Sequence, residues 1–559
     1  MQQLGSKAAT VIALLAVVFS FGSCDKENGG DTPPVNETFN FVAARLDNRS
    51  PGIQYNNVGT SPVIRLSFTA PVNKSSVVAN ILLKENNSTN VPVNISYENS
   101  DSIVVLTPQN PLKYLSRFSV NVSDQLLSSG GGKLNSNIDV ILITAIDPAD
   151  KFPRISDEAL LDLVQRQTFK YFWDFGHPVS GMARERNTSG DLVTTGGTGF
   201  GVMAIIVGIE RNFISRAEGL NRIRTIADFL NDKAQKYHGA FAHWLHGSAG
   251  TTIPFSANDN GGDLVETSFL MQGLLTARQY FSNTNAEETE LRNKINALWN
   301  GVEWNWYRRN NENVLYWHWS PDKQWVMNHQ IRGWNEALIT YVLAASSNTH
   351  AIDAVVYNEG WARNGAIRNG NTYHGIKLPL GPPLGGPLFF AHYSFLGIDP
   401  NNLSDQYANY WEQNTAHSLI HYNYSIANPR NFAGYSDSVW GLTASDDPNG
   451  YKAHEPNNDN GTISPTAALS SFPYTPTESM KALNFFYYKL GDRIWKEYGF
   501  TDAFNLSIPW FANSFLAIDQ GPIIIMIENH RSGLLWKLFT SAPEVKTGLK
   551  KLGFQAPYL

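Results

Sequence analysis

Three carboxylates lie close together in residues 258–266, which read NDNGGDLVE. Asp263 and Glu266 are three residues apart, so they share one face of the helix that the following apolar residues predict. A helix N-terminus stabilises a charged carboxylate, whereas burial and mutual repulsion raise the pKa of one member of a close pair. Such a pair can separate into a general acid and a general base. The alternative is that Asp263 only caps the helix and Glu266 pairs with an arginine.

Two other motifs in the sequence have simpler explanations than ligand binding. If Asn260 and Gly261 occupied positions five and six of an EF-hand, Thr267 would stand at position twelve, where calcium needs a glutamate. The run GTGFG at 197–201 has the spacing of a dinucleotide fingerprint, but it follows no predicted strand, so close helix packing explains it better. Cys24 is the one cysteine, which excludes a cysteine zinc site and an internal disulfide. We therefore expect no metal and no cofactor.

Aromatic residues are concentrated between residues 299 and 334, where seven tryptophans occur. Pyranose rings present flat C–H faces that stack on exposed aromatic rings. Trp317, Trp319 and Trp325 lie in a polar loop and are candidate sugar platforms. Plain packing in the core remains an equal alternative for each of them.

The overall composition favours a neutral substrate. Charged residues make up 16% of the chain and aromatic residues 12%, and the formal net charge is −6. A nucleic-acid partner is not expected from an acidic chain with few charges. Neutral sugars suit this composition better than phosphates.

The elements that must position these residues fall into two parts. Short alternating runs at 38–147 predict a small β-sandwich, and helical periodicity at 148–559 predicts an all-α part. We expect about a dozen helices there, and twelve helices without strands suggest six hairpins closed into an α/α toroid. The long Pro, Gly and Asn-rich connections, such as 238–262 and 428–462, are of the kind that builds a site.

The N-terminus has the pattern of an exported lipoprotein. Residues 1–23 hold an apolar run after Lys7 that is too short for a permanent membrane helix, so we expect these residues to be a signal peptide. Small residues precede Cys24 as in a lipobox, so we expect diacylation of Cys24 and attachment to the outer membrane, at the cell surface or its periplasmic face. Residues 24–37 are polar and should form a flexible tether.

Several long blocks carry a resemblance to a known family. GGDLVETSFLMQGLL, RGWNEALITYVLAASSNTH, LGPPLGGPLFFAHYSFLGIDP, GTISPTAALSSFPYTPTESMKAL and LAIDQGPIIIMIENHRSGLLW occur in this order. Together they resemble the glucoamylase-like family, glycoside hydrolase family 144. The resemblance implies an (α/α)6 barrel that cleaves β-1,2-glucan with inversion, either internally or by releasing sophorose. Residues 38–147 resemble the bacterial Ig-like domains that precede surface enzymes, so the fold class is a β-sandwich followed by an (α/α)6 barrel.

The resemblance also implies a set of site residues. The acids of the family's cleft fall on Asp259, Asp263, Glu266, Glu336 in the GWNE block and Asp519 in the AIDQGP block. We expect the general acid in the Asp263 and Glu266 cluster, and the base across the mouth, first at Asp519 and second at Glu336. Asp259 is expected to orient water or sugar. Trp334, also in the GWNE block, is added to the candidate sugar platforms.

Two rival functions remain from the sequence. A surface lipoprotein that binds glycan without cutting it would share the anchor, the β-domain and the aromatic residues, although it would not need five converging acids. A hydrolase of another glucan linkage, such as α-1,4, could use the same toroid. The expected partners are a β-glucan and the outer membrane, and the protein is expected to be a monomer.

Overall fold

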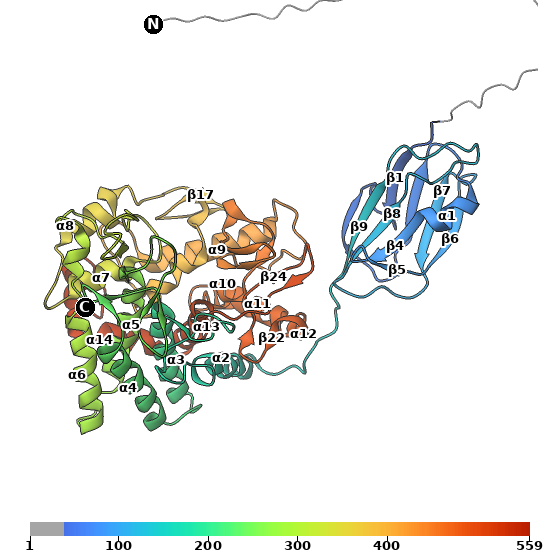
Figure 1. Ribbon diagram of the computed structural model, residues 1–559. Coiled ribbons are helices and arrows are strands. Elements are labelled where there is room, and N and C mark those ends of the chain that lie inside the picture. The colour runs from blue at the N-terminus through green and yellow to red at the C-terminus, as the bar shows by residue number, and fades with distance from the viewer. Residues whose placement is uncertain (1–37) are drawn as a thin grey trace, which may run out of the picture.

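The computed structural model describes residues 38–559, which form a β-part and a larger helical part joined by a connecting segment (Figure 1). The predicted signal peptide, Cys24 and the tether lie outside the described residues. Within residues 38–559, no helix has the length and apolar character needed to cross a membrane.

Two sheets enclose the core of the β-part. One sheet has the strand order β1-β3-β7-β6 and the other β2-β9-β8-β4-β5. In β3 (Ile64–Phe68) every second residue is buried, as expected for a strand with one face on a core. Their shared core contains Leu66, Val104, Val120 and Leu142. The other strands and the one helix of this part are β1 (Phe41–Leu46), β2 (Gln54–Val58), α1 (Lys74–Asn80), β4 (Ile81–Glu85), β5 (Thr89–Val91), β6 (Val93–Glu98), β7 (Ile103–Pro108), β8 (Arg117–Val122) and β9 (Ile138–Thr144).

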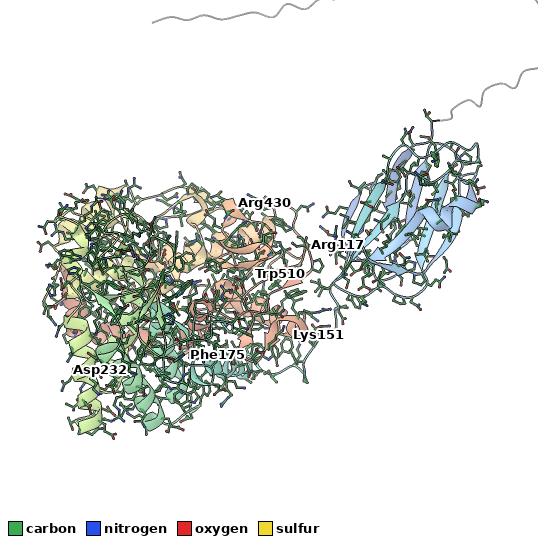
Figure 2. All side chains as sticks on the ribbon, viewed as in Figure 1. Arg117, Lys151, Phe175, Asp232, Arg430 and Trp510 are labelled. Carbon is green, nitrogen blue, oxygen red and sulfur yellow. The ribbon has the colours of Figure 1, made fainter. Side chains whose placement is uncertain are left out.

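The connecting segment is fixed to the helical part by charged and aromatic contacts. Lys489 forms an ion pair with Asp150 at 2.7 Å. The Arg154 guanidinium lies 4.4 Å from the ring centre of Tyr488. Figure 2 labels Lys151 where this segment reaches the helical part.

Helices that are buried all round form the centre of the helical part. Every residue of α3 (Thr195–Glu210) except the last is buried, because its sequence is apolar or small on all faces. It packs against α5 (Leu264–Tyr280) and α13 (Ala517–Ser532). The approach to α5 is so close that a Cβ added at Gly273 would lie 2.1 Å from the carbonyl oxygen of Gly199. The packing explanation of the glycine-rich run is therefore consistent with the structure.

Amphipathic helices lie outside this centre. In α4 (Arg216–Asp232) Ser215 and Glu218 form a capping box, and the helix packs against α6 (Ala286–Asn300). The further α-helices are α2 (Asp157–Trp173), α7 (Leu338–Ser346), α8 (Ala354–Val356), α9 (Tyr410–Ala427), α10 (Pro465–Leu469), α11 (Pro476–Tyr488), α12 (Gly491–Ile494), α14 (Leu534–Ser541) and α15 (Pro543–Lys551).

The expectation of a helical part without strands is wrong in detail. Short strands pair within the long connections, for example β10 (Leu192–Thr194) with β13 (Trp244–His246), and β19 (Ala444–Asp447) with β20 (Gly450–Ala453). These strands have two to four residues, which is too short for alternation to stand out in a sequence. Residues 388–396 also form no continuous helix, but two short 3-10 turns at Leu388–Ala391 and Tyr393–Leu396.

Candidate active site

Asp263 is held rigidly at the start of α5. Its Oδ1 accepts hydrogen bonds from the backbone N–H groups of Val265 and Glu266, at 3.0 and 2.9 Å, which makes it the helix cap. Its Oδ2 accepts a hydrogen bond from Trp317 Nε1 at 3.1 Å and lies 3.2 Å from His243 Nδ1. The side chain is fully buried. With these four partners, Asp263 is better suited to positioning its neighbours than to transferring a proton.

Glu266 faces the start of α3 from the first turn of α5. Its Oε2 accepts a hydrogen bond from the backbone N–H of Gly196 at 2.8 Å, and its Oε1 lies 4.0 Å from His243 Nε2. A Cβ at Gly196 would approach that carboxylate oxygen to 2.5 Å, so the contact requires glycine. Burial raises the pKa of Glu266, with a contribution from the charge of Asp263.

His243 connects the two acids and carries a positive charge at neutral pH. Although burial lowers the pKa of its imidazole, the charges of Glu266 and Asp263 outweigh burial and raise this pKa to about 9. The imidazolium therefore accompanies the two carboxylates as a counter-ion.

Asp259 lies beside this group in the loop before α5. Its Oδ1 is 3.3 Å from His318 Nε2, which accepts a hydrogen bond from the backbone N–H of Gly261 at 3.1 Å. Burial raises the pKa of Asp259 to about 7, and the charge of Asp263 acts in the same direction. The prediction that Asp259 joins the cluster is consistent with this placement.

Glu336 lies just before α7, and the charges of Glu266 and Asp263 act on its carboxyl group. Burial raises the pKa of its carboxyl group to about 7, and the charges of Glu266 and Asp263 also raise it. Among residues 38–559, no other side chain donates a hydrogen bond to this carboxyl group. Glu336 can therefore hold a proton near neutral pH and is not tied to another side chain.

Asp519 lies in the first turn of α13 and forms a pair with Asp502. Both side chains are buried, and the charge of Asp502 acts on the carboxyl group of Asp519. Burial and the charge of Asp502 raise the pKa of Asp519, and burial raises the pKa of Asp502 to about 7. Asp502 Oδ2 also accepts the backbone N–H of Asp446 at 2.6 Å. Because both pKa values are raised, one carboxyl group of the pair can keep a proton near neutral pH while the other is ionised.

Tyr393 interacts electrostatically with acids of both groups, the one at α5 and the one at α13. Burial raises the pKa of its hydroxyl group, and the charges of Asp519, Glu336 and Glu266 raise it further. The hydroxyl group therefore lies within electrostatic reach of acids from α13, the α7 entrance and α5. The five acids expected from the sequence thus fall at the start of α5, just before α7 and at the start of α13, and acids from all three places act on Tyr393.

The candidate tryptophans are placed differently from one another. Trp317 reaches the acids directly, through its hydrogen bond to Asp263, and stacks on His329 with ring centres 4.9 Å apart. Trp319 packs against Trp306 with centres 5.9 Å apart, and Trp325 packs against Tyr316 at 5.5 Å.

Trp334 does not fit the predicted role of a sugar platform. Only 4% of it is exposed, and its ring packs against Phe395 and Tyr410. The physical reason is that these rings enclose the indole in the core and leave it no free face for a sugar.

Sequence reasoning missed His243, Gly196, Tyr393 and Asp502. His243 lies within the long connection 238–262, so loop length was the one available signal for it. The others come from elements far apart in the chain, and only folding brings them to the acids.

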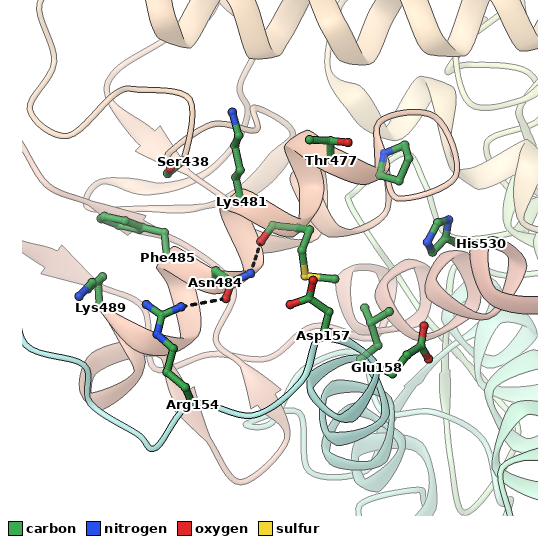
Figure 3. Close-up of a pocket in the computed structure, with 13 residues that line it drawn as sticks. Arg154, Asp157, Glu158, Ser438, Thr477, Lys481, Asn484, Phe485, Lys489 and His530 are labelled. Atoms are coloured by element: carbon green, nitrogen blue, oxygen red, sulfur yellow. Dashed lines mark hydrogen bonds between the residues drawn. The ribbon is translucent and has the colours of Figure 1, made fainter.

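A groove lies elsewhere on the helical part. This groove of about 800 Å³ lies between the start of α2 and α11, and Figure 3 shows Arg154, Lys481, Phe485 and His530 around it. It contains none of the five acids and carries mixed charges. In residues 38–559, no group of three or more His, Cys, Asp or Glu side chains is arranged to hold a metal ion.

Comparison with known proteins places both parts. Residues 42–141 match the family described as "Bacterial Ig-like domain", and residues 328–543 match the family described as "Putative glucoamylase". A relative from Parabacteroides distasonis, named exo β-1,2-glucooligosaccharide sophorohydrolase (non-reducing end), is 49% identical over 421 residues. The match covers 71% of this chain and 58% of that relative, so the chain spans little more than half of the relative's length.

Two solved structures are similar over most of the chain. An endo-β-1,2-glucanase from Chitinophaga pinensis, in complex with sophorotriose and glucose, is 53% identical with a TM-score of 0.71. The match covers 73% of this chain and 100% of that protein. A β-1,2-glucanase from Parabacteroides distasonis is 40% identical with a TM-score of 0.70, over 93% of this chain and 74% of that one. The chain therefore belongs to the glucoamylase-like family of glycoside hydrolases, with a bacterial Ig-like domain ahead of its helical part.

Proposed function

We propose that the protein hydrolyses β-1,2-glucan with inversion of the anomeric centre, by acid and base catalysis between carboxyl groups. The observation that carries this proposal is the presence of two separate groups of acids, one at the start of α5 and one at the start of α13. Inverting glycosidases need a carboxylic acid on one side of the bond and a carboxylate with a water molecule on the other. The linkage is supported by relatives of 49% and 53% identity whose names contain β-1,2-glucan activities.

Glu336 is assigned as the general acid. Its pKa of about 7 lets it keep a proton at neutral pH, and no other described side chain fixes its carboxyl group by a donated hydrogen bond. The sequence placed the acid in the Asp263 and Glu266 cluster, but the four partners of Asp263 argue against proton transfer there. Glu336 gives its proton to the glycosidic oxygen as the bond to the anomeric carbon breaks.

The base is assigned to Asp519, acting as a pair with Asp502. A pair that shares one proton carries one negative charge and can accept a proton from water. That water adds its oxygen to the anomeric carbon from the opposite face of the sugar ring. Glu266, Asp263 and Asp259 bind and orient the sugar, with His243 balancing their charge.

The finer architecture and the location belong to the same proposal. We propose an (α/α)6 barrel over residues 148–559, with α3, α5, α7 and α13 among its inner helices, behind a β-sandwich at 38–147. Residues 1–23 would be a signal peptide that is removed, and a lipid on Cys24 with a tether at 24–37 would hold this monomer at the outer membrane. The Ig-like domain then separates the enzyme from the membrane.

Incubation of the purified protein with β-1,2-glucan and, separately, with starch distinguishes the candidate functions. Chromatography of the products should show sophorose or its longer homologues from β-1,2-glucan and none from starch. Cleavage of starch alone would favour a glucoamylase-type enzyme, and retention of glucan without cleavage would favour a binding protein. Product size also separates endo action from release of sophorose.

A further inference from the structure

Two exposed aromatic side chains lie beside two different groups of the acids. Phe255 is 48% exposed and Tyr451 is 44% exposed. Single exposed apolar residues are common on protein surfaces, so exposure alone shows nothing. What distinguishes these two residues is that both adjoin the candidate active site.

Phe255 is attached to the group formed by Asp259, Asp263 and His243. Its backbone N–H donates a hydrogen bond to the carbonyl oxygen of Asp259 at 2.8 Å. Its ring centre lies 4.3 Å from that of His243 and 4.8 Å from that of Trp244. Since His243 is held by Asp263, this ring packing also fixes the phenyl ring. One side of the ring is thus supported by the site, and the rest is open to solvent.

Tyr451 is attached to the other group of acids through the hairpin of β19 and β20. It pairs across the hairpin with Asp446, whose backbone N–H donates to Asp502. The Asp446 carboxylate accepts a hydrogen bond from Ser514 Oγ at 2.5 Å and lies 3.3 Å from Arg186 Nη1. These contacts anchor the hairpin beside the pair of Asp502 and its partner acid.

The charge of Asp519, the acid assigned as the base, also acts on the hydroxyl group of Tyr451. Tyr393, between the two groups of acids, interacts with both Tyr451 and Glu266. Phe255 therefore adjoins the α5 acids through His243 and Asp259, and Tyr451 adjoins the other group of acids through Asp446 and Asp502.

We propose that Phe255 and Tyr451 are two sugar platforms that hold a neutral β-linked glucose chain on either side of the catalytic carboxyl groups. This inference rests on the proposed function. Each ring offers an apolar face to the C–H groups of a pyranose, and the phenol of Tyr451 adds a hydrogen-bonding group. Because the Phe255 ring already packs against His243 and Trp244, binding at that platform costs little side-chain entropy.

The test compares Phe255→Ala and Tyr451→Ala with the wild type on β-1,2-glucan. Losing one stacking contact should raise KM about tenfold and leave kcat within about threefold. Phe255→Trp and Tyr451→Phe keep an aromatic ring and should keep KM near the wild-type value. Tyr114→Ala removes another exposed aromatic, 40% exposed and located in the Ig-like part, and should change nothing.

An unchanged KM in both alanine variants would overturn the proposal. So would a large loss of kcat in Phe255→Ala that tryptophan does not restore, since Phe255 would then act only by positioning His243. If the wild type released no product, the proposed function would fail. Native electrophoresis in gels that contain β-1,2-glucan would then test the platforms separately: retardation lost in the alanine variants supports them, and unchanged retardation refutes them.

Discussion

Replacing Asp263 by asparagine should destabilise the protein, whereas replacing Glu336 by glutamine should not. Asp263 receives four donors, and an asparagine has one acceptor oxygen for them. If that oxygen keeps the two helix-cap bonds, the amide N–H₂ group faces Trp317 Nε1 and the His243 imidazolium, which are donors themselves. Leaving a neutral and a charged donor unsatisfied costs about 2–5 kcal/mol of unfolding free energy in total.

Glu336, unlike Asp263, does not depend on donors from other side chains. No other described side chain donates a hydrogen bond to its carboxyl group, and burial raises its pKa to about 7, so the folded protein tolerates its neutral form. Glutamine has the shape of that neutral form and should leave the free energy of unfolding within about 0.5 kcal/mol of the wild type.

Differential scanning calorimetry at pH 7 measures the difference between these two variants. Asp263→Asn should lower Tm by at least about 3 °C, and Glu336→Gln should leave it within about 1 °C. Asp322→Asn is the matched control, because its side chain is 57% exposed and it belongs to the neighbouring loop. A wild-type Tm for Asp263→Asn, or equal losses in the Asp263 and Glu336 variants, would refute the reasoning.

The remaining predictions concern catalysis, pH, packing and anchoring. Glu336→Gln should lower turnover of β-1,2-glucan at least about a hundredfold, and the wild-type rate should fall above about pH 7 as Glu336 loses its proton; full activity in the variant would refute the assignment. Burial raises the pKa of Glu336, Asp259 and Asp502 to about 7, so the stability they give is present below about pH 4 and lost as pH rises through about 7. Tm should therefore be higher at pH 5.5 than at pH 8, and an increase toward pH 8 would contradict this. Gly273→Ala should cost at least about 3 kcal/mol or prevent folding, since its Cβ would meet backbone at 2.1 Å; a soluble variant with wild-type Tm would argue against that packing. Cys24→Ala should release the protein from the membrane fraction, as blotting of fractionated cells would show; unchanged retention would remove the lipoprotein hypothesis.

The sequence predicted the parts of the site that follow from local rules. Asp263 could be placed at a helix start because a capping acid followed by an apolar run is a local signal. Spacing along one helix also put Glu266 near it. The family resemblance supplied Glu336 and Asp519, and the structure brings both near the others.

Other features depend on tertiary structure and could not be predicted. The pairing of Asp502 with Asp519, and the contact of His243 with Phe255, join residues that no periodicity relates. Residue type did not reveal that Trp334 is core, because an indole serves equally in a core or under a sugar. The burial of each ring depends on how the chain turns around it.

Time-resolved proton NMR of β-1,2-glucan hydrolysis by the wild-type protein tests the central claim most directly. The experiment identifies the linkage in the products and the anomer that is formed first at the new reducing end. We predict β-1,2-linked oligosaccharides whose new reducing end forms first as the α-anomer, because acid and base lie on opposite sides of the bond in an inverting site. Initial release of the β-anomer would contradict the inverting mechanism, and absence of any β-1,2-linked product would contradict the proposed function.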